Sequence, residues 1–402
     1  MMNNTYNNTS DILVCDKLIC SGCGACSIVC PTNCIEMSNN SEGFYYPTIN
    51  ASQCVNCNKC RNNCPSINSS RQGQSSPDVY AFVNKNKNVI KASSSGGAFT
   101  AFSEYIIRNG GVVFSCVFDS KFNAIFDRAE SIEELAKMRG SKYVESKAWI
   151  VYADVKEELA NEKLVLFVGL PCQVAGLLST LSEEYKKTLI TIDLLCHGVP
   201  SHGLFEAYIE MVTAQKGQII DYSFREKKYW GWGNWGRYNY KKGDRIKEKK
   251  TLVANDYYYS LYFKENNYRE SCYTCSFAKL PRISDITIGD CWNEGELAPM
   301  IDNIDGVSLI LLNTDVGRRL YDEIKDDNQS FLVPLEKAIN NNGTISNPTT
   351  RPQERDSFYK DVNELGFEKA AQKYTHLKYV FPVVARYIPK GIKKKIKKLI
   401  KR

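Results

Sequence analysis

The sequence predicts an α/β protein built from a small cysteine-rich α+β unit, a larger mixed-sheet domain and a basic helical tail. Three observations lead to this prediction. Cysteines recur at short fixed intervals between residues 20 and 65, strand-like and helix-like segments alternate from residue 79 onward, and residues 386–402 are strongly basic. Such alternation is typical of helices packed on a partly parallel sheet. We therefore expect three parts, at residues 1–66, 78–385 and 386–402.

The N-terminal cysteines form one pattern twice. Residues 20–31 and 54–65 both read C-x2-C-x2-C-x3-C-P, and short strands are predicted at Ile35–Met37 and Phe44–Pro47. Bacterial ferredoxins bind two 4Fe–4S clusters with this run, and its fourth cysteine usually binds the other cluster. We predict a two-cluster ferredoxin-like domain. The first cysteine set comprises Cys20, Cys23, Cys26 and Cys64, and the second cysteine set comprises Cys54, Cys57, Cys60 and Cys30.

Zinc sites and disulfides are the competing interpretations of these cysteines. Structural zinc sites use pairs of C-x2-C rather than a triple followed by Cys-Pro. The polar, Asn-rich residues 1–10 do not resemble a secretion signal, and sixteen cysteines without such a signal favour thiolate ligands over disulfides. The longest apolar runs, such as Leu164–Val168, are far shorter than the roughly 20 residues that span a bilayer. We expect a cytoplasmic protein.

The net charge of +7 arises from the tail. Nine of the 52 Lys and Arg lie in residues 386–402, which contain no acid, and the rest of the chain is slightly acidic. This distribution argues against nucleic-acid binding by the body of the protein. Apolar residues at helical spacing predict a basic amphipathic helix, which could lie on the inner face of a membrane. A solvated tail is an equally good interpretation. The apolar positions are Ile392, Ile396, Leu399 and Ile400.

The larger domain follows a linker rich in Ser, Gln and Gly at residues 67–77. The predicted strands are Val79–Val83, Gly111–Phe118, Leu164–Val168, Leu189–Leu195, Arg237–Tyr240, Asp285–Asp290 and Val307–Leu312. The predicted helices are Gly97–Arg108, Ile132–Met138, Trp149–Leu159, Val174–Leu181, Asp256–Asn267 and one after Thr314. Cys172 and Cys196 each follow an apolar strand, so both are expected at strand carboxyl ends, where open α/β sheets bind ligands.

A further cysteine pair, Cys272 and Cys275, could converge with Cys172 and Cys196. Spacing alone does not decide between zinc and an iron–sulfur cluster for these four residues, because a C-x2-C pair serves both. Cys15, Cys34 and Cys116 are interpreted as core thiols.

Residues 78–313 resemble the coenzyme F420 hydrogenase/dehydrogenase beta-subunit family. The resemblance is closest to bacterial members in which a two-cluster ferredoxin segment is fused in front. Six segments in the same order carry it, namely SSSGGA at 93–98, RGSKYV at 139–144, GLPCQVAG at 169–176, CHGVP at 196–200, CYTC at 272–275 and DITIGD at 285–290. Two positions depart from the family. Ser95 stands where archaeal members often have an acid, which weighs against a deazaflavin substrate. Cys291 stands where relatives tend to have an aromatic residue, so it could compete as a metal ligand, although a buried or near-cluster thiol is the first interpretation.

The resemblance implies FAD and one more 4Fe–4S cluster, and hence a flavin-binding α/β domain. The implied ligands of this third cluster, which we name the third cysteine set, are Cys172, Cys196, Cys272 and Cys275. The implied FAD contacts are Ser95, Gly96, Gly97, Gly140, Ser141, Lys142 and Tyr143.

The residue types of this segment suit a flavin. Gly96 and Gly97 precede an apolar helix, so free amides at a positive helix end could approach a ring or phosphate. Lys142 could neutralise a phosphate or the charge of a reduced flavin. The alternative is an ordinary tight turn and a solvated lysine. His197 follows an implied ligand and could transfer a proton, or could simply hydrogen-bond to the site. His197 and Lys142 are thus the candidate catalytic residues.

These expectations combine into an iron–sulfur flavoprotein oxidoreductase. It would pass electrons between a ferredoxin-type or other redox partner and a small molecule that exchanges a hydride at FAD, possible substrates being a sugar intermediate and a deazaflavin. Two alternatives stay open. One is an electron-transfer subunit without its own substrate site that docks to a partner enzyme, and the other is a zinc-stabilised interaction module.

Overall fold

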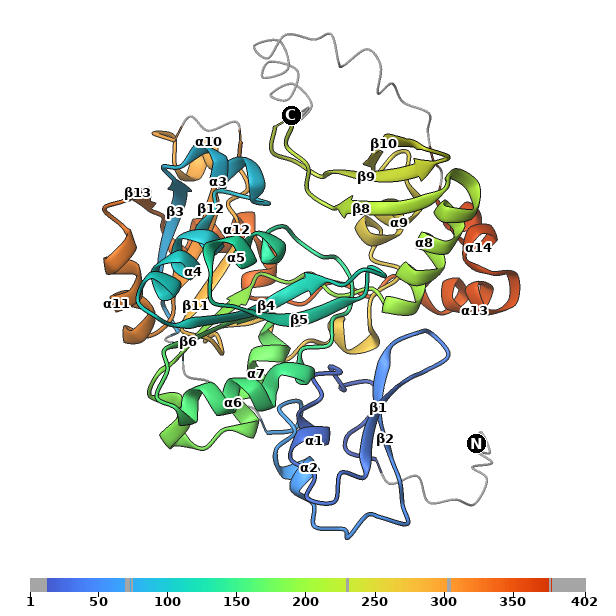
Figure 1. Cartoon of the computed structure of the whole chain (residues 1–402), viewed down its shortest axis with the longest axis horizontal. Coiled ribbons are helices and arrows are strands. Elements are labelled where there is room, and N and C mark those ends of the chain that lie inside the picture. The colour runs from blue at the N-terminus through green and yellow to red at the C-terminus, as the bar shows by residue number, and fades with distance from the viewer. Residues whose placement is uncertain are drawn as a thin grey trace.

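An eight-stranded mixed sheet forms the centre of the protein (Figure 1). The computed structural model describes residues 13–68, 73, 75–228, 231–301, 305–375 and 377, so the helix predicted at residues 386–402 lies outside the described residues. In spatial order the strands are β13 (Asn328–Leu332), β3 (Asp78–Asn84), β12 (Ser308–Leu312), β11 (Ile286–Asp290), β7 (Leu189–Leu194), β6 (Val165–Gly169), β4 (Val112–Phe118) and β5 (Ala124–Ala129).

The sheet confirms the predicted α/β class. Strands β11, β7, β6 and β4 are parallel, and antiparallel strands flank them on both sides. Each predicted strand of this domain is present within a few residues of its expected bounds. The two outermost strands, β5 and β13, were not predicted. Polar residues such as Asp127 and Arg128 interrupt the apolar alternation of β5, as is common on edge strands.

Helices cover both faces of this sheet and bury a core on each side. On one face Phe102 and Ile106 pack with Val113. On the other face Val174 packs with Val112 and Phe114, so neighbouring residues of β4 point to opposite faces. The first face carries α4 (Ala98–Arg108), α5 (Ile132–Met138) and α11 (Asp315–Ile324), and the second carries α6 (Tyr152–Ala160) and α7 (Pro171–Thr180).

Two predicted helices differ in their bounds. Helix α7 begins at Pro171 rather than at Val174, because proline suits the first helical turn, where no amide hydrogen bond is lost. The helix predicted at Asp256–Asn267 ends at Phe263, and Glu265 then adopts a left-handed conformation that a helix cannot continue through. The remaining short elements are α3 (Lys87–Ala92), α10 (Glu294–Leu297), α12 (Leu335–Asn341), η1 (Trp149–Val151), η2 (Glu183–Lys186), η3 (Glu270–Cys272) and η4 (Gly343–Ile345).

An aromatic-rich layer stands beside the main sheet (Figure 1). It contains a three-stranded antiparallel sheet and four helices, and its core is built largely from Tyr and Phe, including Phe205, Tyr208, Tyr222, Phe224 and Tyr258. Its elements are β8 (Gln218–Ser223), β9 (Trp235–Lys242), β10 (Arg245–Leu252), α8 (His202–Lys216), α9 (Tyr257–Phe263), α13 (Arg355–Leu365) and α14 (Phe367–Tyr374).

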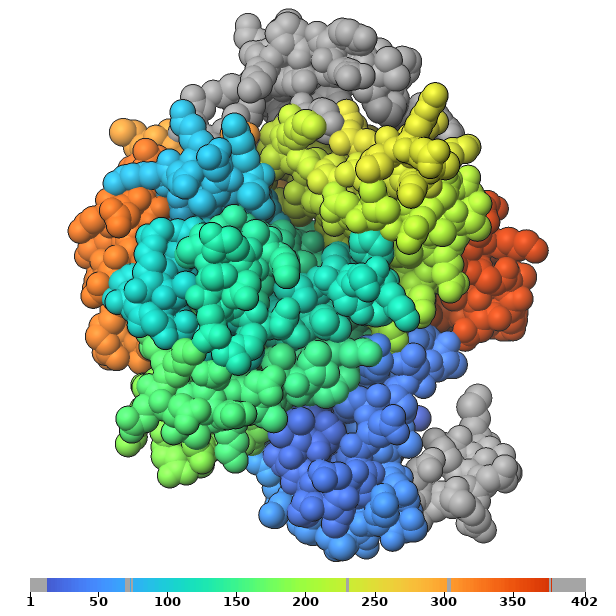
Figure 2. Space-filling model, viewed as in Figure 1, coloured from blue at the N-terminus to red at the C-terminus, as the bar shows by residue number. Residues whose placement is uncertain are grey.

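The N-terminal unit forms a lobe below the segment that holds α6 and α7 (Figure 2). It contains the two predicted strands as an antiparallel hairpin, and its helix α1 packs against α7. Its elements are β1 (Ile35–Asn39), β2 (Tyr45–Ile49), α1 (Ala25–Ile28) and α2 (Lys59–Asn62). None of the helices described here has the length and apolar character needed to cross a membrane.

A buried arginine fastens this lobe to the larger domain. Arg269 is 1% exposed, and it donates to the Cys20 carbonyl at 2.7 Å and to the Tyr45 carbonyl at 2.9 Å. Its third contact is an ion pair of 2.6 Å with Glu145, whose other oxygen accepts the Tyr45 amide. One side chain therefore holds both the first cysteine run and the β1–β2 hairpin.

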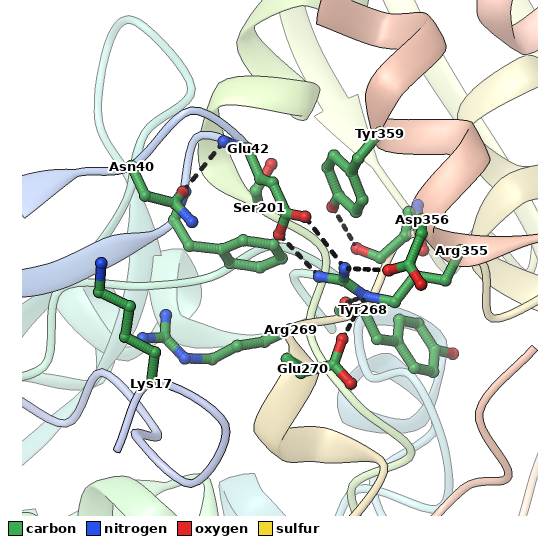
Figure 3. A network of polar contacts seen from close by, with 12 residues as sticks. Lys17, Asn40, Glu42, Ser201, Tyr268, Arg269, Glu270, Arg355, Asp356 and Tyr359 are labelled. Carbon is green, nitrogen blue, oxygen red and sulfur yellow. Dashed lines mark hydrogen bonds and ion pairs between the residues drawn. The ribbon is translucent and has the colours of Figure 1, made fainter. Parts of the chain in front are cut away.

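A second set of contacts surrounds Arg355, at the tip of the hairpin (Figure 3). Its guanidinium donates to both carboxylate oxygens of Glu42, at 3.0 and 2.7 Å, and also pairs with Glu270 at 3.3 Å. Nearby, the Tyr45 ring stacks on His202 with ring centres 3.8 Å apart. The lobe is thus held by buried polar contacts rather than by an apolar surface alone.

We expect Arg269→Met to weaken this attachment. The substitution leaves the buried Glu145 carboxylate without its cation, and removing one partner of a buried pair costs about 3–5 kcal/mol. The measurement is hydrogen exchange of the β1 and β2 amides, whose protection should fall. Arg128→Met is the matched control, because Arg128 forms its ion pairs at a partly exposed position away from the lobe, where loss costs about 0–1 kcal/mol. Equal protection in the two variants would contradict the role of Arg269.

Candidate functional site

The cysteines of the first set lie near one another in the structure. Burial and the nearby charges of Cys20 and Cys64 raise the pKa of Cys23 to about 12. Burial also raises the pKa of Cys26 above its usual range, and the charges of Cys23, Cys20, Cys64 and Cys60 add to the effect. Charges weaken with distance, so Cys64 lies near Cys20, Cys23 and Cys26 although it belongs to the other run, and Cys60 of the second set is also near Cys26.

The second cysteine set gathers at the outer part of the lobe. Burial raises the pKa of Cys60, and the charges of Cys30 and Cys54 raise it further, so these three thiols are neighbours. Cys57 is exposed, and Val55 beside it is 62% exposed. The second cysteine set therefore lies closer to the solvent than the first.

Two further thiols, Cys15 and Cys34, contact cysteines of these sets. The sequence did not indicate these contacts. Cys15 hydrogen-bonds to Cys20 and Cys64, and that bond lowers the pKa of Cys20 to about 6 against the opposing effect of burial. Cys34 lies 3.4 Å from the Cys30 sulfur. Both were predicted as core thiols, and both do pack in the small core of the lobe.

The third cysteine set lines one cavity of about 90 Å³. Cys172 lies in the first turn of α7, Cys196 follows β7, and Cys272 and Cys275 lie in and just after η3. Burial raises the pKa of Cys172, and the charges of Cys275, Cys196 and Cys272 raise it further. Four thiols separated by up to 103 positions in the sequence thus converge.

The first and third cysteine sets are neighbours across the contact between α1 and α7. The charge of Cys23 reaches Cys172 and raises its pKa, after burial and the other thiols of the third set. Gly176 of α7 faces Cys23 so closely that a β-carbon there would lie 2.9 Å from that of Cys23. Gly24 is equally constrained, because a β-carbon would meet Trp149 at 2.4 Å. These glycines allow the two sets to approach.

A second cavity, of about 270 Å³, lies at the carboxyl ends of β6, β7 and β11. Parallel strands of open α/β sheets bind their ligands at this end. Six of the seven predicted FAD contacts line the cavity, namely Ser95, Gly97, Gly140, Ser141, Lys142 and Tyr143. Gly96 instead packs against the sheet, where a β-carbon would lie 2.2 Å from the Phe82 carbonyl oxygen.

The Lys142 amine caps the carboxyl end of α5. Its amine donates to the carbonyls of Lys137, Met138 and Arg139 at 3.0 to 3.2 Å, and burial lowers its pKa to about 8. The three contacts use all the hydrogens of an ammonium group. The predicted catalytic lysine therefore lines the cavity while its amine serves as a helix cap.

Arg225 and Asp290 hold the two sheets together at the cavity wall. Arg225 pairs with Asp290 at 2.8 Å and donates to the Tyr143 hydroxyl at 3.0 Å, and its Nε has no partner among the described residues. Asp290 also accepts from the Trp232 indole at 3.2 Å, and Trp232 stacks on Trp292. The sequence pattern indicated Asp290 only as the end of a strand and gave no role to Arg225.

His197 lies between the two cavities. Together with Cys196, it lines both of them. Burial lowers its pKa, against the opposing charge of Asp290, so the imidazole is neutral at pH 7. The third cysteine set and the larger cavity thus share a wall.

The larger domain matches a known family. Residues 162–338 match the model for the C-terminal part of the beta subunit of coenzyme F420 hydrogenase/dehydrogenase, and residues 19–68 match a 4Fe-4S dicluster domain. Residues 162–338 of this chain therefore correspond to the C-terminal domain of the coenzyme F420 hydrogenase/dehydrogenase beta-subunit family. The family match contains the third cysteine set, and the dicluster match contains the first and second sets.

Several named proteins are similar to this chain. One subunit of the F(420)H(2) dehydrogenase of Methanosarcina mazei is 21% identical over 330 residues, which cover 79% of this chain and 85% of that protein. The coenzyme F420-dependent sulfite reductase of Methanocaldococcus jannaschii is 28% identical over 164 residues, covering 40% of this chain and 25% of that protein. A chain of the F420-reducing NiFe hydrogenase complex from Methanosarcina barkeri aligns with 75% of this chain and 91% of its own length, at 16% identity and a TM-score of 0.44.

A buried lysine gives the protein a pH-dependent stability. Lys227 is 5% exposed and donates to the carbonyls of Ile90 and Ser95, at 2.8 and 2.5 Å. Burial, together with the charge of Arg225, lowers its pKa to about 7. Below pH 7 the Lys227 amine is charged, and folding bears the full free-energy cost of burying that charge. Above pH 7 the folded protein loses this proton while the unfolded chain keeps it, so stability rises with pH.

We expect Lys227→Met to flatten the rise in stability between pH 7 and 9. One proton bound only by the unfolded chain contributes up to about 1.4 kcal/mol per pH unit. Urea denaturation at several pH values gives the slope for the wild type and the variant. Lys91→Met, which removes a solvent-exposed lysine, controls for the loss of one positive charge. Identical slopes in the wild type and Lys227→Met would refute the assignment.

Proposed function

We propose that this protein is an iron–sulfur flavoprotein oxidoreductase. It passes electrons between a one-electron redox partner and a small molecule that exchanges a hydride at FAD. A deazaflavin is one substrate class, supported by the coenzyme F420 in the names of both relatives, and a sugar intermediate is the other. The observation that carries the proposal is the continuous arrangement of three cysteine sets and one ligand-sized cavity.

The order of these sites supports a path for electrons. The second cysteine set lies outermost, where Cys57 is exposed to a partner. The first set follows, and Cys23 brings it beside Cys172 of the third set. Cys196 then belongs to the third set and also to the wall of the larger cavity. Each step joins neighbouring sites.

The chemistry of the thiols fits iron–sulfur clusters. Burial and mutual repulsion raise the pKa of most thiols in the first and third sets, so metal-free thiolates would be unfavourable there. A bound metal centre reverses this, because a coordinating thiol is deprotonated outright. The twelve residues that would hold three clusters are the members of the three sets.

Zinc is a poorer match for the same sulfurs. A zinc ion holds each thiolate at about 2.3 Å and so draws its ligands close together. Among the residues that the structure describes, no group of three or more His, Cys, Asp or Glu side chains is gathered closely enough for a single metal ion.

The larger cavity fits a flavin with its phosphates. Its wall contains the cations Arg139, Lys142 and Arg225 and the anion Asp290, so positive charge exceeds negative charge. The buried Nε–H of Arg225 is a donor without a partner in the described structure, and such donors call for an acceptor. Tyr143 and Tyr262, stacked with ring centres 4.4 Å apart, add an aromatic wall.

Bound FAD would supply the exchange between a two-electron hydride and single electrons. The chain's own residues prepare the cavity for it. Asp290 fixes the orientation of Arg225, and the stacked Trp232 and Trp292 limit access of water from that side. The neutral imidazole of His197 is able to accept a proton at the wall between the two cavities.

A second candidate function is an electron-transfer subunit that docks to a partner enzyme and has no substrate site of its own. The relative from Methanosarcina mazei is named as a subunit, which favours this alternative. The two candidates differ in flavin content, since a protein with clusters but no FAD would leave the hydride step to its partner.

We expect about twelve irons per chain after anaerobic purification, because three 4Fe–4S clusters require that number. The double variant Cys272→Ser/Cys275→Ser should hold about eight, while the control Cys116→Ser/Cys291→Ser, in thiols outside all three sets, should match the wild type. Iron and acid-labile sulfide assays measure both. About eight irons in the wild type would remove the third cluster from the account.

We expect Arg225→Lys to bind FAD about 10- to 100-fold more weakly than the wild type. The lysine retains the charge that balances Asp290 and loses the free Nε–H, and a hydrogen bond to a charged group contributes about 1.5–3 kcal/mol. Fluorescence of released FAD under anaerobic conditions gives the dissociation constants. Arg237→Lys, at an ion pair in the three-stranded sheet, is the control. Purified wild type without flavin would favour the second candidate function.

A further inference from the structure

A buried arginine stands at the wall of the cavity that the third cysteine set lines. Arg282 precedes β11, is 1% exposed, and is one of the lining residues of that cavity. Burying a guanidinium is costly unless its charge and its donors are satisfied. The contacts of Arg282 therefore indicate what the cavity is built to hold.

Its contacts within the described residues are incomplete. One Nη donates to Asp193 at 3.0 Å, and the other donates to the Phe277 carbonyl at 3.2 Å. The Nε–H has no partner in the described structure, and neither does the second oxygen of Asp193, although that residue is fully buried. A side chain with a purely structural role would gain from pairing these two groups, as arginine commonly does in a two-pronged contact with a carboxylate.

Arg282 and all four cysteines of the third set line the same cavity. A second buried arginine, Arg269, instead lies 3.7 Å from the Cys20 sulfur of the first set. Of these two cations, only Arg282 lines the cavity of the third set, and its Nε–H has no partner among the described residues.

We propose that Arg282 sets the reduction potential of the iron–sulfur cluster held by the third cysteine set, by placing its charge and its Nε–H against that cluster. The inference rests on the proposed function, which supplies the cluster. Net charge and hydrogen bonds to sulfur are among the properties that set such potentials. A cluster bound by four thiolates becomes more negative on reduction, and a nearby cation stabilises the reduced state.

The consequence is a direction for one step of the path. One electron leaves the cluster of the first cysteine set, which is oxidised, and reduces the cluster of the third set, with no proton required. By raising the potential of the acceptor, Arg282 favours transfer toward the larger cavity. Its own ion pair with Asp193 keeps the guanidinium in place at the end of β7.

The test is an EPR-monitored redox titration of Arg282→Gln in the full chain. We expect the midpoint potential of the third cluster to fall by at least about 59 mV. For a one-electron step, a fall of that size changes the equilibrium constant of electron transfer from the first cluster tenfold. Arg282→Lys, which retains the charge but not the Nε–H, should recover part of the fall. Arg237→Gln, an arginine of the three-stranded sheet, should leave the potential unchanged.

A second variant guards against misfolding, because Arg282→Gln leaves the buried Asp193 without its cation. The double variant Arg282→Gln/Asp193→Asn removes both charges, and the potential should fall in the same direction by a smaller amount. If the double variant holds about twelve irons and its third cluster titrates at the wild-type potential, the inference is overturned. If the wild type itself holds about eight irons, the proposed function has failed instead.

Discussion

The buried ion pair between Arg269 and Glu145 is the contact on which the arrangement of the cysteine sets depends. It joins the Cys20 loop and the β1–β2 hairpin to the larger domain at one point. The same docking places α1 on α7, and with it Cys23 beside Cys172. A single-electron path needs adjacent centres, so the polar contacts that seat the N-terminal lobe also determine whether the path is continuous.

Burial of charge is the second constraint. The first and third cysteine sets lie in surroundings that raise most of their thiol pKa values, and buried arginines stand next to them. Neither arrangement is favourable by itself, since buried thiolates repel one another and a buried guanidinium with an unpaired donor is costly. The two become compatible when an anionic metal cluster binds among the thiols and beside the cations.

The sequence predicted those parts of the fold and of the sites that arise from local residue patterns. The doubled cysteine run predicted the N-terminal sets, and alternating apolar segments predicted the strands of the main sheet within a few residues. It indicated a strand at residues 237–240, within β9, but it did not predict β8, β10 or the aromatic layer around them, or the roles of Arg225, Arg269 and Arg282. These arginines act through partners such as Glu145, which is 124 positions from Arg269. Contacts at such separation leave no periodic signal in a single sequence.

The central claim is that three clusters and a flavin form one continuous path. The EPR spectrum of the fully reduced protein tests it most directly, because unpaired electrons on adjacent clusters interact magnetically. The account predicts a spectrum broadened and split by interaction between the clusters of the first and third cysteine sets, and a simpler spectrum once the third cluster is removed. A spectrum equal to the sum of independent clusters would contradict the claim.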